Sequence, residues 1–291
     1  MSRLGAALLL ALLLVEPARG FTVRDMLGRE VTIAAPPRRI VSLVPSVTEI
    51  IFALGAEDRL VGVTDYCDFP PAAKDKPSVG GMLAPSLEAV VALSPDLVIA
   101  TDAGIRLVTF DQLERLDIPF YIVRANRLEE TMDAIARLGE LTGRRDVVAP
   151  LNEGLRRRIR AVRTAVMPFR RPRVLYVLWP EPLIVPGREA IVTELIQVAG
   201  GESITARDRG DYPRYSLEAA VAREPEVILL ANHGTGSGAI SREPWERFGS
   251  LPAVKTGRIH SVDGNLLHRY GPRIVDGLEK LARLLHPEAF R

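Results

Sequence analysis

The hydrophobic positions of this chain follow two periods. Short continuous apolar runs predict buried strands, and segments with apolar residues three and four positions apart predict helices. The predicted strands cover residues 39–44, 60–63, 97–100, 120–123, 174–178, 227–231 and 259–262. The predicted helices begin near residues 46, 86 and 216 or cover residues 110–116, 128–142, 146–167, 189–199 and 273–285. Strands that alternate with helices imply parallel crossover units, so the predicted fold class is α/β.

One stretch of sequence occurs twice. Residues 86–100 and 216–231 both begin Ser-Leu-Glu-Ala, continue through a proline and an acidic residue, and end in a fully apolar run. Each copy predicts a short helix followed by a strand, with Glu88 and Glu218 at the same position of the two copies. Two copies this far apart indicate two similar lobes rather than a solenoid. Two lobes leave a cleft between them, where small ligands commonly bind.

A single long helix is predicted to join the lobes, over residues 146–167. Its apolar residues recur every three or four positions: Val147, Leu151, Leu155, Ile159, Val162 and Val166. Pro150 falls in the opening turn, where its missing N–H matters least. Such a helix is about 33 Å long and acts as a rigid strut, although an ordinary surface helix within one domain is the alternative. The predicted lobes are residues 38–145 and 172–291.

The helix after the first strand has its own start and stop signals. Ser46 and Glu49 have the spacing of a capping box, and Gly55 can end the helix. We therefore predict that both side chains bond to backbone N–H groups at the helix start.

Residues 1–20 have the features of an export signal. Arg3 precedes an apolar stretch over residues 4–15, and residues 18–20 have the small-x-small pattern of a cleavage site. The stretch is shorter than the roughly 20 residues that span a bilayer, and no cysteine lies near for a lipid anchor. We predict cleavage after Gly20 and a soluble periplasmic protein.

The composition excludes some classes of protein. The formal net charge is only +2, which gives no support for nucleic-acid binding. The arginines at 156–158 and 170–171 are predicted to form a solvated face. The only cysteine is Cys67, so no intramolecular disulfide is possible. Cys67 is predicted to be a small buried side chain, with a thiolate ligand to cobalt as the alternative.

Four segments of the first lobe carry a resemblance to a known family. Residues 39–56 read RIVSLVPSVTEIIFALGA, residues 61–71 read VGVTDYCDFPP, and residues 79–82 and 95–100 continue the pattern. The second lobe matches more loosely, at residues 186–189, 200–201, 212–218 and 271–274. The chain resembles the helix-backbone periplasmic binding proteins of ABC importers, and within them the vitamin B12-binding members most closely. The resemblance implies a non-catalytic monomer that carries cobalamin or a related corrinoid to a permease dimer with its ATPase.

The resemblance also implies ligand-contacting residues. Tyr66 from the first lobe, and Trp179 and Tyr212 from the second, match aromatic side chains that face the corrinoid, which has broad apolar faces and an amide rim. The predicted site includes Asp263 and the turn at Gly80 and Gly81. Each aromatic residue has the alternative of a core or surface position, and Asp263 that of a loop cap. Tryptophans of the family are replaced here by Gly80, Thr101 and Asp102.

Two histidines and two glutamates complete the candidates. His233 and His268 follow predicted strands, and each is expected to be a solvent-exposed loop residue. The alternative is that either reaches the cleft and touches cobalt or haem iron. Glu88 and Glu218 match the glutamates that meet arginines of the permease, one from each lobe. The alternative is that each carboxylate only stabilises the start of its helix through the helix dipole.

Other ligands and activities are weighed against the corrinoid. A haem or ferric-siderophore receptor of the same architecture is the main alternative, with Arg188, Arg209 and Arg214 available for an anionic siderophore. A receptor for bare zinc or manganese needs histidines from both lobes, yet all four lie in the last third of the chain. The sequence has no G-x-S-x-G, H-E-x-x-H, P-loop or G-x-G-x-x-G motif, so we predict that it is not an enzyme.

Overall fold

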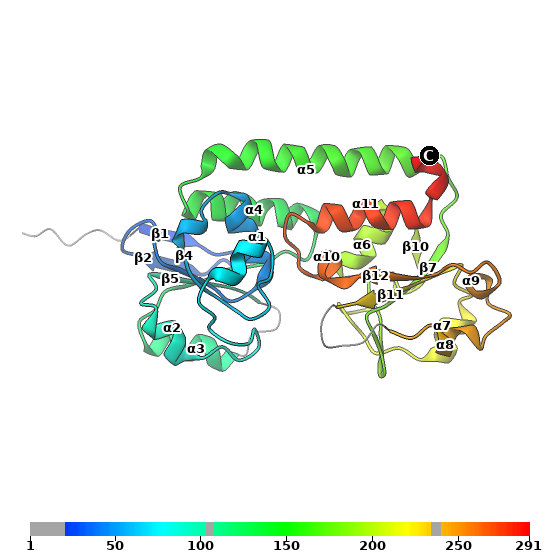
Figure 1. Ribbon diagram of the computed structural model, residues 1–291, viewed down its shortest axis with the longest axis horizontal. Helices are drawn as coiled ribbons and strands as arrows, with labels where there is room; N and C mark the ends of the chain where they lie inside the picture. Colours follow the sequence, from blue (N-terminus) through cyan, green and yellow to red (C-terminus); the bar gives the residue numbers. More distant parts are fainter. Residues whose placement is uncertain (1–20, 103–106, 234–239) are drawn as a thin grey trace, which may run out of the picture.

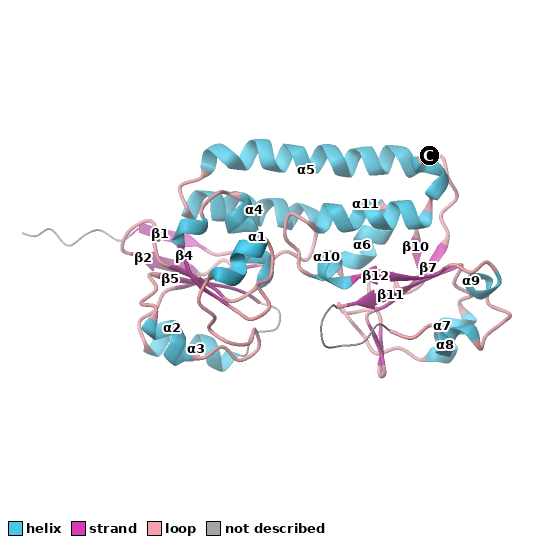
Figure 2. Cartoon of the chain, in the orientation of Figure 1, coloured by secondary structure: helices cyan, strands magenta, loops and turns pink. Residues whose placement is uncertain are grey.

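The computed structural model describes residues 21–102, 107–233 and 240–291, which form two α/β lobes side by side (Figure 1, Figure 2). The strands of the first lobe are β3 (Ile40–Ser42), β4 (Leu60–Val63), β5 (Leu97–Thr101) and β6 (Phe120–Val123). Those of the second are β7 (Arg173–Val177), β10 (Glu202–Ser203), β11 (Val227–Asn232) and β12 (Ile259–Asp263). The sheets are parallel, with orders β4-β3-β5-β6 and β10-β7-β11-β12. Both orders place the first strand between the second and the third, so the prediction of two similar α/β lobes is confirmed.

Helices flank each sheet. The first lobe has α1 (Pro45–Ala53), α2 (Leu87–Ala92), α3 (Leu107–Arg115) and α4 (Leu128–Leu141). The second has α6 (Ile191–Val198), α7 (Leu217–Ala222), α8 (Glu243–Glu246), α9 (Pro252–Lys255), α10 (Gly264–His268) and α11 (Ile274–Leu285). Figure 1 shows α2 and α3 below the first sheet and α7 and α8 below the second, so the two lobes have corresponding lower sides.

The duplicated sequence forms the same local structure twice. The Ser86 hydroxyl accepts a hydrogen bond from the Ala89 N–H (3.2 Å), and the Ser216 hydroxyl accepts one from the Ala219 N–H (3.0 Å). These caps begin α2 and α7 by satisfying an N–H group that has no partner within the helix. Each helix leads into the third strand of its sheet, β5 or β11, whose apolar residues are fully buried.

Two hairpins have no counterpart in the sequence prediction. Strands β1 (Phe21–Arg24) and β2 (Glu30–Ile33) pair antiparallel. They join the first lobe because the Met26 N–H donates to the Ile122 carbonyl (3.0 Å) and Ile33 is buried in its core. The first lobe therefore begins before the predicted boundary at residue 38. The second hairpin pairs β8 (Trp179–Pro180) with β9 (Leu183–Ile184).

The long helix α5 (Arg145–Val166) lies across both lobes (Figure 1). It packs on α4 of the first lobe and on α11 of the second. Leu155, Ile159, Val162 and Val166 on its predicted face are buried and belong to one hydrophobic core that includes residues of both sheets. Because this core is shared, the lobes cannot rotate about α5 without exposing apolar surface.

The arginines of α5 hold the helix to its neighbours. Arg158 pairs with Asp276 (2.5 Å) and Glu279 (2.8 Å) on α11, and Arg156 pairs with Glu129 (2.8 Å) on α4. Hydrogen bonding to Glu279 raises the pKa of Arg158. The side chains of Arg156 and Arg158 are nevertheless 42% and 39% exposed, so the prediction of a solvated arginine face is confirmed, with acidic partners from helices distant in the sequence.

The predicted capping box at Ser46 and Glu49 is wrong. Val44 is the residue before the helix, and no side chain caps α1. Glu49 is instead 4% exposed and accepts hydrogen bonds from Arg273 of the second lobe (2.5 and 3.0 Å). The Arg273 guanidinium also lies 3.7 Å over the Phe69 ring of the first lobe. Burial raises the pKa of Glu49, and the two hydrogen bonds from Arg273 oppose that shift.

The predicted export signal, residues 1–20, lies outside the described residues. Among the described segments, no helix is both long enough and apolar enough to cross a membrane.

Replacing Glu49 by Ala should lower the free energy of unfolding by about 3 kcal/mol, because Arg273 would lose the carboxylate that compensates its burial. Urea denaturation of the purified protein measures this change. Glu153→Ala is the matched control, since Glu153 pairs with Arg157 at a surface where both side chains are mostly exposed. That variant should lose less than about 1 kcal/mol. Equal effects of the two substitutions would contradict a stabilising role for the pair between the lobes.

Candidate ligand-binding cleft

A cleft of about 800 Å³ lies between the two lobes. Its walls come from segments that follow the strands of both sheets, together with residues around α10. The carboxyl ends of parallel strands are where α/β proteins bind their ligands. The lining residues are Val44, Pro45, Ser46, Asp65, Tyr66, Asp68, Met82, Thr101, Asp102, Ala125 and Asn126 of the first lobe, and His233, Asn265, His268, Arg269 and Tyr270 of the second.

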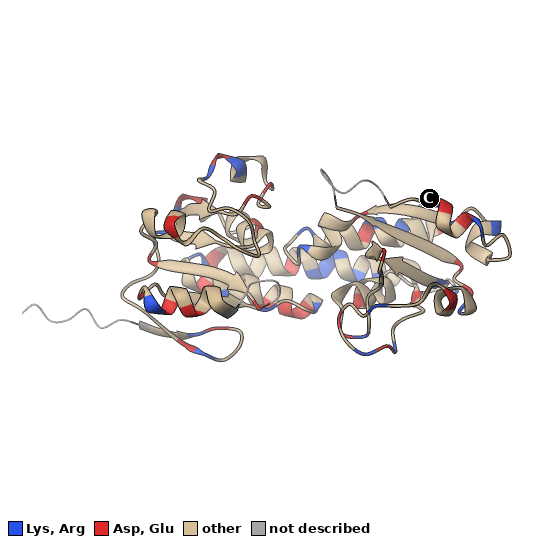
Figure 3. Ribbon diagram, turned by 90° about the horizontal axis from the view of Figure 1, so that it is seen from below, with Lys and Arg blue, Asp and Glu red and all other residues tan. Residues whose placement is uncertain are grey.

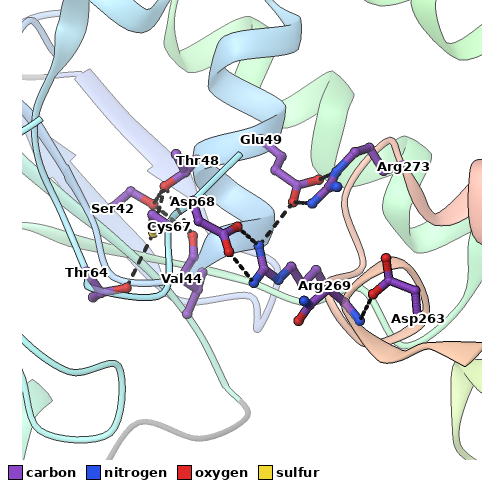
Figure 4. Close-up of polar contacts among 11 residues, drawn as sticks. Ser42, Val44, Thr48, Glu49, Thr64, Cys67, Asp68, Asp263, Arg269 and Arg273 are labelled. Atoms are coloured by element: carbon purple, nitrogen blue, oxygen red, sulfur yellow. Dashed lines mark hydrogen bonds and ion pairs between the residues drawn. The ribbon is translucent and has the colours of Figure 1, made fainter. Parts of the chain in front are cut away.

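Cys67 anchors the loop that carries Tyr66 (Figure 4). Its sulfur accepts a hydrogen bond from the Thr48 hydroxyl (3.2 Å) and contacts the Thr64 hydroxyl at 3.3 Å. Cys67 is 3% exposed, so the prediction of a small buried side chain is confirmed. Burial raises the pKa of the thiol, which argues against a thiolate ligand. The Cys67 side chain is buried, whereas the side chain of the preceding residue, Tyr66, is 58% exposed.

An ion pair crosses from one lobe to the other beside Tyr66. Arg269 of the second lobe binds both carboxylate oxygens of Asp68 and lies 4.0 Å from Glu49 (Figure 4). The hydrogen bond from Arg269 lowers the pKa of Asp68, which is therefore ionised at neutral pH. Both residues line the cleft, so this ion pair forms part of the cleft wall and joins the two lobes there.

The polar wall of the cleft is rich in hydrogen-bond acceptors. Asp65 accepts from the Ser78 hydroxyl, Asp68 pairs with Arg269, and Asp102 lies 3.8 Å from Arg124. Among the described lining residues, Arg269 is the only arginine or lysine, against three aspartates. The cleft therefore favours a ligand with hydrogen-bond donors at its rim and disfavours one with several negative charges.

A chain of hydrogen bonds forms the floor of the cleft in the second lobe. The Tyr176 hydroxyl lies 2.7 Å from Nε2 of His268, and the Tyr212 hydroxyl lies 3.3 Å from Nδ1. The hydroxyls of Tyr212 and Tyr270 are 2.9 Å apart. Burial, reinforced by the nearby His233 ring, lowers the pKa of His268 to about 3, so its ring is neutral. Burial also raises the pKa values of the three tyrosines, which stay protonated.

The structure brings together only part of the site predicted from the resemblance. Tyr66 lines the cleft, and Tyr212 lies behind it in contact with Tyr270. Trp179 is 43% exposed on the β8–β9 hairpin and is not among the lining residues. Asp263 caps α10 by accepting a hydrogen bond from the Asn265 N–H (3.0 Å), as the loop-cap alternative had it.

The glycine turn does not line the cleft. Gly80 has a φ of +88°, which a side chain would strain, and its N–H donates to the Ser78 hydroxyl (3.0 Å). That serine also donates to Asp65. The turn of Gly80 and Gly81 therefore supports a carboxylate of the wall and leads to Met82, which lines the cleft.

Both histidines line the cleft and both are half-buried, so the expectation of solvent-exposed positions is not met, although His233 does lie outside any helix or strand. Their ring centroids are 5.4 Å apart. His268 has both ring nitrogens occupied by tyrosine hydroxyls, which leaves His233 as the better candidate for a metal atom of a ligand. No group of three or more potential metal ligands occurs among the described residues. The three arginines suggested for a siderophore, Arg188, Arg209 and Arg214, are not among the lining residues.

Several cleft residues were not singled out from the sequence. Asp65 and Asp68 flank Tyr66 in a segment that carries the family resemblance, so their position after a strand was an available signal. Arg269 and Tyr270 had no such signal. They reach the cleft because residues 264–268 form α10, where the sequence predicted only a loop.

Glu88 and Glu218 lie outside the cleft. Both are exposed in the first turn of their helices, on α2 and α7, below the two sheets and away from α5 (Figure 1). The backbone N–H of Glu88 and the Ser86 hydroxyl lower the pKa of Glu88, which is ionised at neutral pH. Seen from below, basic and acidic residues are distributed over both lobes (Figure 3).

Residues 40–266 match the family of periplasmic binding proteins, and this match covers most of the chain. The chain belongs to this family. The binding protein is of the type that includes vitamin B12- and haem-binding members, and such proteins are substrate-binding components of transport systems.

The relatives of this chain are named for different ligands. The binding protein is 30% identical to the vitamin B12-binding protein of Vibrio cholerae, over 86% of this chain and 90% of that one. It is 28% identical to an uncharacterised ABC transporter substrate-binding lipoprotein of Bacillus subtilis, over 93% and 87%. Its fold matches the periplasmic heme-binding protein RhuT of Roseiflexus with a TM-score of 0.77 and 28% identity, over 87% and 99%. The fold therefore does not select the ligand.

The neutral His268 should make the binding protein sensitive to acid. The unfolded chain takes up this proton near pH 6.5, and the folded chain only at about pH 3. Between these values the unfolded state binds more protons, so the free energy of unfolding falls as the pH is lowered. NMR titration should show an unprotonated His268 ring down to about pH 4, and a His268→Gln variant should lose less stability over the same interval. A ring that titrates near pH 6.5 would contradict this account.

Proposed function

We propose that this protein captures cobalamin or a closely related corrinoid in the cleft and delivers it to an ABC importer. The ligand is a flat macrocycle whose faces are largely apolar and whose rim carries primary amides. The exposed ring of Tyr66 offers an aromatic surface for one face. The relatives named for vitamin B12 and for heme support a macrocyclic ligand. Our choice of a corrinoid over haem rests on the charged side chains that line the cleft.

The observation that carries the proposal is the excess of carboxylates on the cleft wall. Amide N–H groups of a corrin rim can donate to Asp65, Asp68 and Asp102, and hydrogen bonds to charged acceptors are the stronger kind. A haem instead brings two propionates toward the same carboxylates. The only lining arginine of the described residues, Arg269, already pairs with Asp68. Like charges brought into a cleft cost binding energy, so the wall favours the corrinoid.

Haem is the second candidate because the cleft also holds groups that can coordinate iron. The Tyr66 phenol and the His233 ring both line it, and either residue type serves as an axial haem ligand. The structural relative named for haem supports this alternative. Ferric siderophores are less favoured, because the part of the lining that the structure describes has a single arginine to meet an anionic chelate.

Titration calorimetry with cobalamin, haem and a ferric hydroxamate tests the proposal. We expect one cobalamin per chain and weaker or no binding of the other two. Tyr66→Ala should weaken cobalamin binding by about 1–3 kcal/mol, by analogy with the stacking of bases on aromatic rings, and should leave the melting temperature nearly unchanged.

Leu116→Ala provides the control for Tyr66→Ala. Leu116 is a similarly exposed apolar side chain of the same lobe and does not line the cleft, so its removal should leave the affinity unchanged. Binding of haem without cobalamin would replace the proposal by the second candidate. If Tyr66→Ala binds cobalamin with unchanged affinity, Tyr66 is a surface residue that does not contact the ligand.

For delivery, we propose that Glu88 and Glu218 dock the protein on the two membrane subunits of the importer. The two carboxylates occupy equivalent positions in equivalent helices, one in each lobe. A carrier with two similar lobes can present the same contact to each half of a two-fold symmetric permease. Facing arginines would attract both carboxylates and orient the carrier. Neither glutamate lines the cleft, so docking and ligand binding use separate residues.

The same proposal places the mature protein in the periplasm as a monomer without catalytic activity. The export signal predicted for residues 1–20 supports this location. Sequencing the N-terminus of the exported protein tests the predicted cleavage after Gly20.

Changing Glu88 and Glu218 together to Arg should abolish delivery of cobalamin to the importer and leave cobalamin affinity intact, because attraction at both docking points becomes repulsion. Uptake into vesicles that contain the importer measures delivery, and calorimetry measures affinity. Single reversals should give intermediate defects.

A double reversal of Glu153 and Glu288 controls for net charge, since both are exposed. Glu153 lies on α5, and Glu288 lies in the C-terminal turn Pro287–Phe290 that packs on α5 and α11, on the other side of the molecule from α2 and α7 (Figure 1). This variant should deliver normally. Normal delivery by the Glu88 and Glu218 double variant would mean that these glutamates only stabilise the starts of their helices.

A further inference from the structure

The hydrogen-bond chain at the floor of the cleft can have only one direction. Each hydroxyl in it has one hydrogen to donate, and a neutral histidine ring donates from one nitrogen and accepts at the other. The chain begins at Tyr176, which lies on β7 and is fully buried. Its hydroxyl has no recorded partner except Nε2 of His268, 2.7 Å away, among the described residues.

Burial of Tyr176 determines which atom donates. If Nε2 carried the hydrogen, the Tyr176 oxygen would accept and its own O–H would be left buried without an acceptor. Such an unsatisfied group is costly. Tyr176 therefore donates to Nε2, and the ring hydrogen is on Nδ1. Nδ1–H then donates to the Tyr212 oxygen.

The same direction continues to the surface of the cleft. The Tyr212 oxygen accepts from His268, so its O–H donates to the Tyr270 oxygen, 2.9 Å away. The Tyr270 O–H then has no acceptor within the described protein, and Tyr270 lines the cleft. The backbone of Tyr270 also has a φ of +39°, in the left-handed region that bulky residues rarely adopt. Strain of this kind persists where the surrounding structure determines the position of a side chain.

We propose that Tyr270 is a ligand-binding residue whose hydroxyl donates to an oxygen atom of the bound molecule, and that Tyr176, His268 and Tyr212 are positioning residues that set this direction. The inference rests on the proposed function for the identity of the ligand. The chemistry recognised is an acceptor oxygen, either an amide carbonyl of the corrin rim or the phosphodiester of a complete cobalamin. The first-lobe wall accepts hydrogen bonds through its aspartates, and Tyr270 supplies a donor from the second lobe.

The direction of the chain can be measured without a ligand. Nitrogen-15 NMR of the full-length mature protein at neutral pH reports which ring nitrogen of His268 carries the hydrogen. We expect the Nδ1–H tautomer. A ring with the hydrogen on Nε2 would overturn the proposed direction whether or not the protein binds a corrinoid.

The donor itself is tested with Tyr270→Phe, which removes only the hydroxyl. Cobalamin affinity should fall about five- to tenfold, the effect expected for the loss of one hydrogen bond. Tyr215→Phe is the matched control, because the Tyr215 hydroxyl is buried without a partner and Tyr215 does not line the cleft. It should bind cobalamin as the unchanged protein does. Equal affinities of Tyr270→Phe and the unchanged protein would overturn the assignment of Tyr270.

Cobinamide, which lacks the phosphodiester, distinguishes the two acceptors. A similar loss of affinity for cobinamide in Tyr270→Phe assigns the contact to an amide carbonyl, and a loss confined to cobalamin assigns it to the phosphodiester. If the unchanged protein binds haem and no corrinoid, the proposed function fails, and the same two variants are then titrated with haem. If Tyr270→Phe does not fold, the tautomer of His268 still decides the direction.

Discussion

The arrangement of the cleft depends on the packing of α5 against both lobes. Its buried face shares one hydrophobic core with α4 and α11, so the relative orientation of the sheets is set by apolar contact along a continuous helix. Arg158 adds a polar link to α11, and Glu49 with Arg273 adds a second link nearer the cleft. A ligand that contacts both lobes then meets side chains whose spacing is already determined, which reduces the ordering that binding requires.

The loop that follows β4 combines two roles. Tyr66 faces the cleft, while Asp68 and Phe69 hold Arg269 and Arg273 of the other lobe. Contact with the ligand and contact between the lobes are therefore made by neighbouring residues on one short segment. The buried Cys67 fixes the segment from below.

The positions of the charged side chains at the cleft, rather than the net charge of the chain, indicate which kind of ligand the cleft favours. The formal charge of +2 for the whole chain does not show that the described lining residues of the cleft include three aspartates and one arginine. On the second lobe, neutral tyrosines and a neutral His268 form one hydrogen-bond chain, which in the direction proposed above offers the cleft a single donor, the Tyr270 hydroxyl. Such a site suits an uncharged ligand rim with both amide N–H and carbonyl groups better than a polyanion.

The sequence by itself determined the two α/β lobes, the duplicated helix and strand, and the long connecting helix, because each depends on local periodicity and on which residues are apolar. It also indicated that Tyr66 would lie at the cleft, where the structure has it, since a residue just after a parallel strand lies at the carboxyl edge of the sheet. The partners of Glu49 and Arg158, and the arrival of Tyr270 at the cleft, were decided only by tertiary structure. Their contacts join residues far apart in the chain, and local spacing carries no signal of which distant charge or hydroxyl will lie opposite.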